Sequence, residues 1–173
     1  MNIEIMDDFL PSHYNHYYKN LLSNDQSTLS SPFSWYFVDE LNEKKYKGNF
    51  YFCNEACDID KNMENPHQYH IYEPILNRLN ITMSNVKRIK ANLYPLSGRR
   101  IHHETHIDYT PNRNLRTCLY YINDSNRLTI FDGKKRVRCR NNRAIIFDGS
   151  IPHHSTTPTD VNYACSINID YWL

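Results

Sequence analysis

The sequence predicts a mainly β protein with N-terminal helices, in which short strands form a sandwich or a small barrel. Two observations carry this prediction. After residue 114, short β-prone runs alternate with turn signals such as Asp132-Gly133 and Asp148-Gly149. Before residue 80, apolar side chains recur at helical spacing.

The N-terminal half is predicted to combine two amphipathic helices with short strands. Tyr14–Leu22 and Gln68–Leu79 place their apolar residues on one helical face, the second despite Pro74. Polar or charged segments are expected to be exposed and irregular, at 23–31, 39–47 and 56–66. Aromatic content or alternation predicts strands at Ile3–Phe9, Phe33–Val38, Phe50–Phe52 and Met83–Leu93.

The C-terminal half reads as strands only. Many short strands at close spacing are typical of a sandwich or a barrel. With 173 residues the chain suits one domain over 1–173. We expect 1–85 to be a supporting region of helices and strands, and 86–173 to be the β core. The predicted strands are Leu115–Ile122, Leu128–Phe131, Arg136–Arg140, Ala144–Phe147 and Ala164–Leu173.

Composition excludes some classes of partner and predicts others. A net charge of +1 gives no electrostatic footprint for nucleic acid or for a membrane. The basic run Lys134–Arg140 alternates as a solvated strand face would. The five cysteines have no paired spacing, which favours free thiols in a reducing compartment. No leader or apolar span is visible, so we expect a cytoplasmic protein; its oligomeric state is not predicted.

Ile101–Tyr109 holds the most informative group of residues, the triplet His106-Ile107-Asp108. On an extended strand, residues two apart point to the same side, so His106 and Asp108 can share one metal ion. A third ligand is available at His153 or His154. Two histidines and one carboxylate with open positions are the Fe(II) oxygenase arrangement, and zinc is the alternative metal.

Two choices within this site stay open at this point. His102 and Glu104 form a competing pair, but Asp108 precedes a turn and so lies at a strand end, where sites usually lie. His153 follows Pro152, which restricts the backbone just ahead of it, and this favours His153 only slightly over His154.

Four segments resemble the Fe(II)- and 2-oxoglutarate-dependent dioxygenases, in the prolyl-hydroxylase-like branch. The resemblance runs from about residue 87 to the end, and 6–11 and 32–36 are similar to small phage and bacterial members. It implies a double-stranded β-helix, a jelly roll with a cupin-like barrel. The segments are Asn92–Pro95, His106–Asp108, Thr117–Asn123, and Arg143–Phe147 followed by Pro152-His153.

The resemblance also implies an activity and a set of site residues. His106, Asp108 and His153 would hold Fe(II), and Tyr94 and Tyr121 would contact 2-oxoglutarate. With O2 as the second co-substrate, the reaction would hydroxylate an unactivated C–H bond. The substrate would be a peptide side chain or another small molecule.

One departure from the family pattern concerns the co-substrate. The family carries an Arg or Lys on its last strand, but 161–167 contains no basic residue, and Asn162 or Ala164 takes that place. Arg127, which shares a strand face with Thr129, is the favoured replacement, ahead of Arg116. In several family members a residue of that strand touches 2-oxoglutarate, which makes Thr129 a candidate too. The alternative function is a metal-binding jelly-roll module without 2-oxoglutarate turnover.

Overall fold

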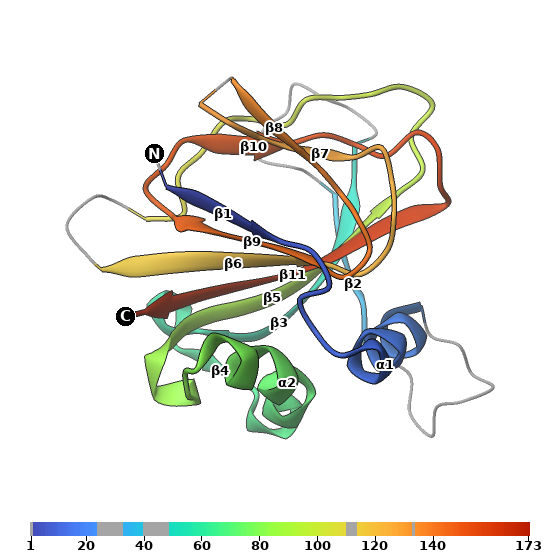
Figure 1. Ribbon diagram of the computed structural model, residues 1–173. Helices are drawn as coiled ribbons and strands as arrows, with labels where there is room; N and C mark the ends of the chain where they lie inside the picture. The colour runs from blue at the N-terminus through green and yellow to red at the C-terminus, as the bar shows by residue number, and fades with distance from the viewer. Residues whose placement is uncertain (1, 24–32, 40–48, 110–113, 133) are drawn as a thin grey trace.

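Two antiparallel sheets face each other, and the helices cover the outer face of the larger one (Figure 1). The computed structural model describes residues 2–23, 33–39, 49–109, 114–132 and 134–173. The larger sheet has the order β1-β9-β6-β11-β5-β3-β2, with β4 paired to β3, and the smaller sheet has the order β10-β7-β8. The predicted jelly roll is confirmed.

The strands are mostly short, and the longest ones form the middle of the larger sheet. The helices are α1 (Ser12–Ser23) and α2 (Tyr69–Leu79), with 3-10 turns at Ile59–Lys61, Pro66–Gln68 and Met83–Asn85. The strands are β1 (Ile3–Met6), β2 (Tyr36–Val38), β3 (Tyr51–Asp58), β4 (Met63–Glu64), β5 (Val86–Pro95), β6 (Leu115–Tyr121), β7 (Leu128–Phe131), β8 (Lys135–Arg138), β9 (Arg143–Asp148), β10 (His153–Ser155) and β11 (Tyr163–Trp172).

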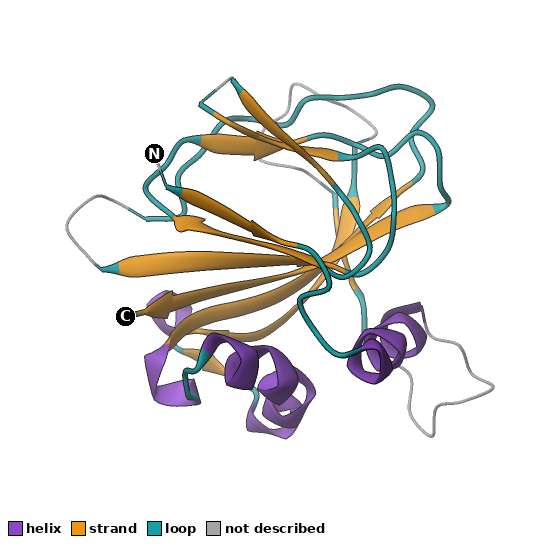
Figure 2. Ribbon diagram, in the orientation of Figure 1, coloured by secondary structure: helices purple, strands orange, loops and turns teal. Residues whose placement is uncertain are grey.

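Strand alternation divides the larger sheet into an apolar outer face and a more polar inner face. On β11, Cys165, Ile167 and Ile169 are buried in one cluster with Leu22 of α1 and Ile75 of α2. Figure 2 shows both helices on this side of the sheet. Because successive side chains of a strand point to opposite faces, the intervening polar residues of β11 point toward the smaller sheet. They are Ser166, Asn168 and Asp170.

A second, smaller apolar cluster lies between the two sheets. It joins Leu119 and Tyr121 of β6 to Phe131 of β7 and to Phe147 of β9. Phe131 and Phe147 meet edge to face, with ring centroids 4.9 Å apart. This cluster fills one part of the interior, and the polar residues described below occupy the rest.

Most predicted elements are present, and the departures have local causes. Residues 56–66 are wrong as one irregular segment, because β3 continues to Asp58 and β4 follows. A register shift between Glu55 and Cys57 inserts one extra residue, which breaks the period-two pattern that identifies a strand. β10 is only three residues long, and pairs with β7. The segments expected at 23–31 and 39–47 fall mostly outside the described residues.

The surface properties follow the composition. Arg136 and Arg138 are exposed on β8 while Val137 between them is buried, so the basic run forms a solvated strand face. All five cysteines are free thiols. None of the described helices is both long and apolar enough to cross a membrane.

Candidate metal centre

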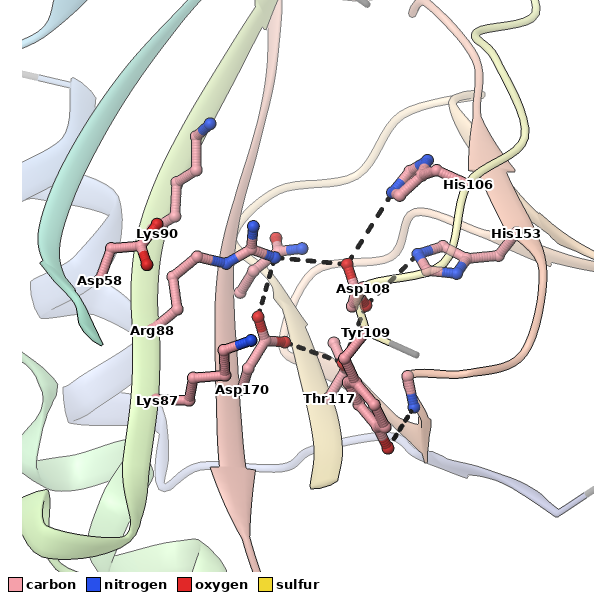
Figure 3. A network of polar contacts seen from close by, with 12 residues as sticks. Asp58, Lys87, Arg88, Lys90, His106, Asp108, Tyr109, Thr117, His153 and Asp170 are labelled. Atoms are coloured by element: carbon pink, nitrogen blue, oxygen red, sulfur yellow. Dashed lines mark hydrogen bonds and ion pairs between the residues drawn. The ribbon is translucent and has the colours of Figure 1, made fainter. Parts of the chain in front are cut away.

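Three side chains predicted to share a metal ion converge at the edge of the interior (Figure 3). The donor atoms of His106, Asp108 and His153 lie within 4.8 Å of one another. His106 Nε2 is 3.9 Å from Asp108 Oδ1, and His153 Nε2 is 3.7 Å from Asp108 Oδ2. Among the described residues, no other group of three or more such ligands lies this close together.

Backbone hydrogen bonds hold the two ligand segments against each other. His106 and His153 form an isolated antiparallel bridge, in which each N–H donates to the other's carbonyl at 2.9 Å. The N–H of Asp108 donates to the carbonyl of Gly149 at 2.8 Å. The segment that holds His106 and Asp108, expected to be an extended strand ending near Asp108, is not a regular strand, because only His102 and His106 make bridges there. Pairing with the segment around His153, rather than a regular strand, sets the ligand spacing.

Both histidines have one ring nitrogen engaged and the other directed at Asp108. His153 Nδ1 lies 2.9 Å from the carbonyl of Ile151, and His106 Nδ1 lies 3.3 Å from that of Glu104. A backbone carbonyl can only accept, so each Nδ1 carries the proton and each Nε2 keeps a lone pair for a metal. Burial lowers the pKa of His153, with Asp108 opposing that effect, so the ring is neutral as a ligand must be.

Asp108 is the most buried of the three candidate ligands. Its side chain is 3% exposed, against 7% for His153 and 43% for His106, so the site is open beside His106. Arg88 Nη2 of β5 lies 3.3 Å from Asp108 Oδ1, and the Thr117 hydroxyl of β6 lies 2.8 Å from Oδ2. Hydrogen-bonded ligands of this kind are pre-oriented for a metal.

The turn before His153 is fixed to the residue after Asp108. The Tyr109 hydroxyl donates to Asp148 Oδ1 at 2.9 Å and accepts from the Gly149 N–H at 3.0 Å. Ser150 donates to the same Asp148 oxygen from its N–H and its hydroxyl. A side chain at position 149 has no room, since a Cβ there would lie 2.3 Å from Tyr109 Cε1.

The competing histidines lie apart from this group. His154 alternates with His153 on β10, and its Nε2 lies 3.2 Å from His102 Nδ1 while Thr105 contacts its other ring nitrogen. Glu104 belongs to no described group of three ligands. The structure thus brings together His153 with His106 and Asp108, and places His154 with His102.

Arg127, the predicted co-substrate anchor, is buried and forms no ion pair with any described residue. It is 3% exposed, and its guanidinium lies 4.0 Å above the ring of Tyr94. Its Nε and Nη1 make no hydrogen bond. Arg116, the weaker candidate, lines a groove on the opposite face of the sheet with Glu4 and Ile146.

The other predicted co-substrate residues lie around Arg127 in the interior. Tyr94 is 8% exposed, and Tyr121 and Thr129 are fully buried or nearly so. The hydroxyls of Tyr121 and Thr129 lie 2.6 Å apart. The last strand supplies no cation here: Ala164, paired with Tyr94, is fully buried, and Asn162 precedes β11.

Two further polar residues of this interior escaped the sequence analysis. Ser166 is 1% exposed, pairs with Tyr121 across the sheet, and its hydroxyl has no partner. His103 stacks on Tyr94 with ring centroids 5.6 Å apart, and its Nε2 also lacks a partner. Burial lowers the pKa of His103 to about 3, with help from Arg127, so the ring is neutral. Strand parity on β11 was the available signal for Ser166; nothing local indicated His103.

Comparison with known proteins supports the fold. No family model matches the sequence, and no curated protein matches it. Solved structures do match. A viral collagen prolyl hydroxylase from Paramecium bursaria Chlorella virus-1, in complex with 2-oxoglutarate, is 12% identical with a TM-score of 0.62, covering 100% of this chain and 97% of its own.

Two further solved structures differ in reaction. A prolyl hydroxylase of Trichoplax adhaerens, in complex with a hypoxia-inducible-factor peptide, is 19% identical with a TM-score of 0.54, covering 98% of this chain and 83% of its own. The α-ketoglutarate-dependent epimerase SnoN of nogalamycin biosynthesis is 10% identical with a TM-score of 0.61, covering 98% and 78%. The chain therefore has the prolyl-hydroxylase-like fold of the Fe(II)- and 2-oxoglutarate-dependent oxygenases.

Proposed function

We propose that this protein is an Fe(II)- and 2-oxoglutarate-dependent dioxygenase that hydroxylates an unactivated C–H bond of a peptide side chain or another small molecule. The observation that carries the proposal is a pair of features in one interior: a group of three potential metal ligands, and the buried guanidinium of Arg127, whose Nε and Nη1 have no hydrogen-bond partner among the described residues. Either feature alone would suit several functions. Together they suit a metal chelator that carries a carboxylate.

The burial of Arg127 supports a bound anion. Burying an unpaired cation is costly, and proteins satisfy buried charges with a partner. Nε and Nη1 of Arg127 have no hydrogen-bond partner among the described residues, and the guanidinium lies over the ring of Tyr94. A carboxylate of 2-oxoglutarate would supply the missing partner through charge-assisted hydrogen bonds. The free hydroxyl of Ser166 and the Nε2 of His103 offer further polar contacts.

The metal ligands fit Fe(II) by their chemistry. When bound, Fe(II) would supply the activation of O2 and the oxidative decarboxylation of 2-oxoglutarate. His106 and His153 would present Nε2 because their Nδ1 protons are held by carbonyl oxygens. Asp108 would present a carboxylate whose Oδ2 is held by Thr117 and whose Oδ1 is held by Arg88. The side chain of His106 is partly exposed, so a substrate can approach the metal centre from that side.

The substrate class comes from the neighbours and from the charge of the chain. One neighbour binds a peptide and others of the same fold are prolyl hydroxylases, whereas SnoN is an epimerase. A net charge of +1 gives no reason to expect a polymeric nucleic acid. A metal-binding module without turnover is the alternative, and the unpaired Arg127 counts against it, since such a module has no use for a buried cation.

Uncoupled turnover tests the proposal, with adjacent histidines as matched variants. We expect the purified protein to convert 2-oxoglutarate to succinate in the presence of Fe(II), O2 and ascorbate, slowly and without added substrate. His153→Ala should abolish both iron binding and succinate formation, whereas His154→Ala, on the opposite face of β10, should retain both. Stoichiometric iron binding without any succinate would favour the module, and equal loss in both variants would contradict the ligand assignment.

A further inference from the structure

Behind Asp108, four side chains from four segments close a ring of polar contacts (Figure 3). Asp170 of β11 is the member farthest from the metal ligands. Its Oδ2 lies 2.8 Å from Arg88 Nη2, and its Oδ1 lies 2.8 Å from the Thr117 hydroxyl. Arg88 and Thr117 are the same two groups that contact Asp108, and the single hydroxyl proton of Thr117 is shared between the two carboxylates. Asp108 therefore cannot rotate without losing contacts on both of its oxygens.

The backbone is irregular on both sides of Arg88. Along β11, the pairing with β5 shifts register between Asp170 and Tyr171. Along β3, the pairing with β5 shifts between Glu55 and Cys57. In the register with β11, Arg88 lies opposite Asp170, directly before the shift on that strand. In the register with β3, Arg88 lies opposite Asp58, one residue past the shift on that strand. Bulges re-aim side chains and are frequent next to active sites, so both irregularities bear on where Arg88 points.

The charges in the ring balance in a specific way. The side chains of Asp108 and Asp170 are each 3% exposed, and Arg88 is the cation that contacts both. Two carboxylates this close and this buried repel each other unless a cation lies between them. The positive charge of Arg88 is balanced by the negative charge of Asp170, so this pair has no net charge. The negative charge of Asp108 is then available to bind the metal.

We propose that Arg88 and Asp170 are positioning residues that together fix the carboxylate of Asp108 in the orientation in which it binds the metal. The inference rests on the proposed function only in taking Asp108 as a metal ligand. It adds residues that touch neither the metal nor the co-substrate. A single nitrogen of Arg88, Nη2, contacts both carboxylates, and the planar guanidinium fixes the direction of both contacts.

Cobalt(II) titration tests this role without 2-oxoglutarate, because the visible bands of bound cobalt report coordination geometry. We expect Arg88→Met to weaken cobalt binding by about 10- to 100-fold and to change its visible spectrum, as losses of groups behind metal ligands do. Arg88→Lys should recover part of the affinity. Adding Asp170→Asn to Arg88→Met should also recover affinity, because the repelling carboxylate is removed. Lys87→Met is the control: it removes the adjacent cation, whose partner is Asp60 at 2.6 Å.

Wild-type affinity and an unchanged spectrum in Arg88→Met would overturn the proposal, and so would a double variant that loses the sum of the two single losses. If Arg88→Met does not fold, Arg88→Lys decides. Lysine keeps the charge but lacks the planar group that directs both N–H bonds, so we expect about a 10-fold loss and an altered spectrum. Unaltered cobalt binding there would overturn it. A wild-type protein that binds cobalt but makes no succinate would contradict the proposed function while leaving this test readable.

Discussion

Gly149→Ala is expected to damage both stability and metal binding, because the turn before His153 has no room for a side chain. A Cβ at position 149 would lie 2.3 Å from Tyr109 Cε1, 2.8 Å from Cδ1 and 2.9 Å from Thr117 Oγ1. Carbon atoms pack at roughly 3.5–4.0 Å, so the Tyr109 ring would have to move by about 1 Å or more. That ring is buried, and its hydroxyl donates one hydrogen bond, to Asp148, and accepts another, from the Gly149 N–H.

The cost follows from these contacts. Overpacking a buried site costs about 1–3 kcal/mol. Weakening the two hydrogen bonds of the Tyr109 hydroxyl adds about 1 kcal/mol for each bond. We therefore expect a loss of about 3–5 kcal/mol in the free energy of unfolding. Iron affinity should fall as well, by about 10-fold, because a displaced Tyr109 would shift the neighbouring Asp108 and a displaced Thr117 would lose its contact with the Asp108 carboxylate.

Urea unfolding and iron titration measure the two effects. Gly98→Ala is the control, since a Cβ at position 98 meets nothing within 4 Å. In a Tyr109→Ala background the same Gly149→Ala change should cost less, because the contact with the ring is gone. Wild-type stability and iron affinity in Gly149→Ala would refute the reasoning, and so would an equal cost in both backgrounds.

Three further predictions concern buried polar groups. Arg127→Met should raise the melting temperature of the protein without co-substrate, because the variant lacks the unpaired buried cation. Iron with 2-oxoglutarate should then raise the melting temperature of the wild type only. The reverse pattern in calorimetry would contradict the role of Arg127 as the co-substrate anchor. His103 stays neutral in the folded protein, whereas in the unfolded chain it takes a proton below about pH 6.5. The free energy of unfolding should therefore fall by about 2 kcal/mol as the pH falls from 7.5 to 5. His103→Gln should remove this part of the pH dependence. An unchanged slope in urea melts would disprove it. Asn142→Ala should cost about 2–4 kcal/mol, since its side chain makes three buried hydrogen bonds at a φ of 57°, whereas Asn141→Ala should cost much less in the same melts.

Regular patterns made most elements predictable. The two helices keep a helical period, and β11 alternates apolar with polar side chains, so the positions of these elements follow from the sequence. β3 was underestimated because its bulge shifts the alternation at Ala56, and β10 because three residues are too few to show a period. Such elements depend on pairing with distant strands, which the local sequence does not record.

The candidate site divides in the same way. His106, Asp108 and His153 stand in short motifs, and the structure brings them together. The ring behind Asp108 was not foreseen, because Arg88 and Asp170 meet only through the register of β5 with β11. The two sheets also bring Arg127 over Tyr94, a contact that sequence reasoning could only rank as a guess.

The charge-transfer absorption of the iron complex tests the central claim most directly. Fe(II) and then 2-oxoglutarate are added without oxygen to the wild type, to Arg127→Met and to Arg127→Lys. We predict a visible metal-to-ligand band in the wild type that saturates with 2-oxoglutarate. Arg127→Lys should need more 2-oxoglutarate to reach the band, and Arg127→Met at least about 10-fold more, because a charge-assisted pair is lost. Iron binding without any band in the wild type, or equal titrations in all three proteins, would contradict the account.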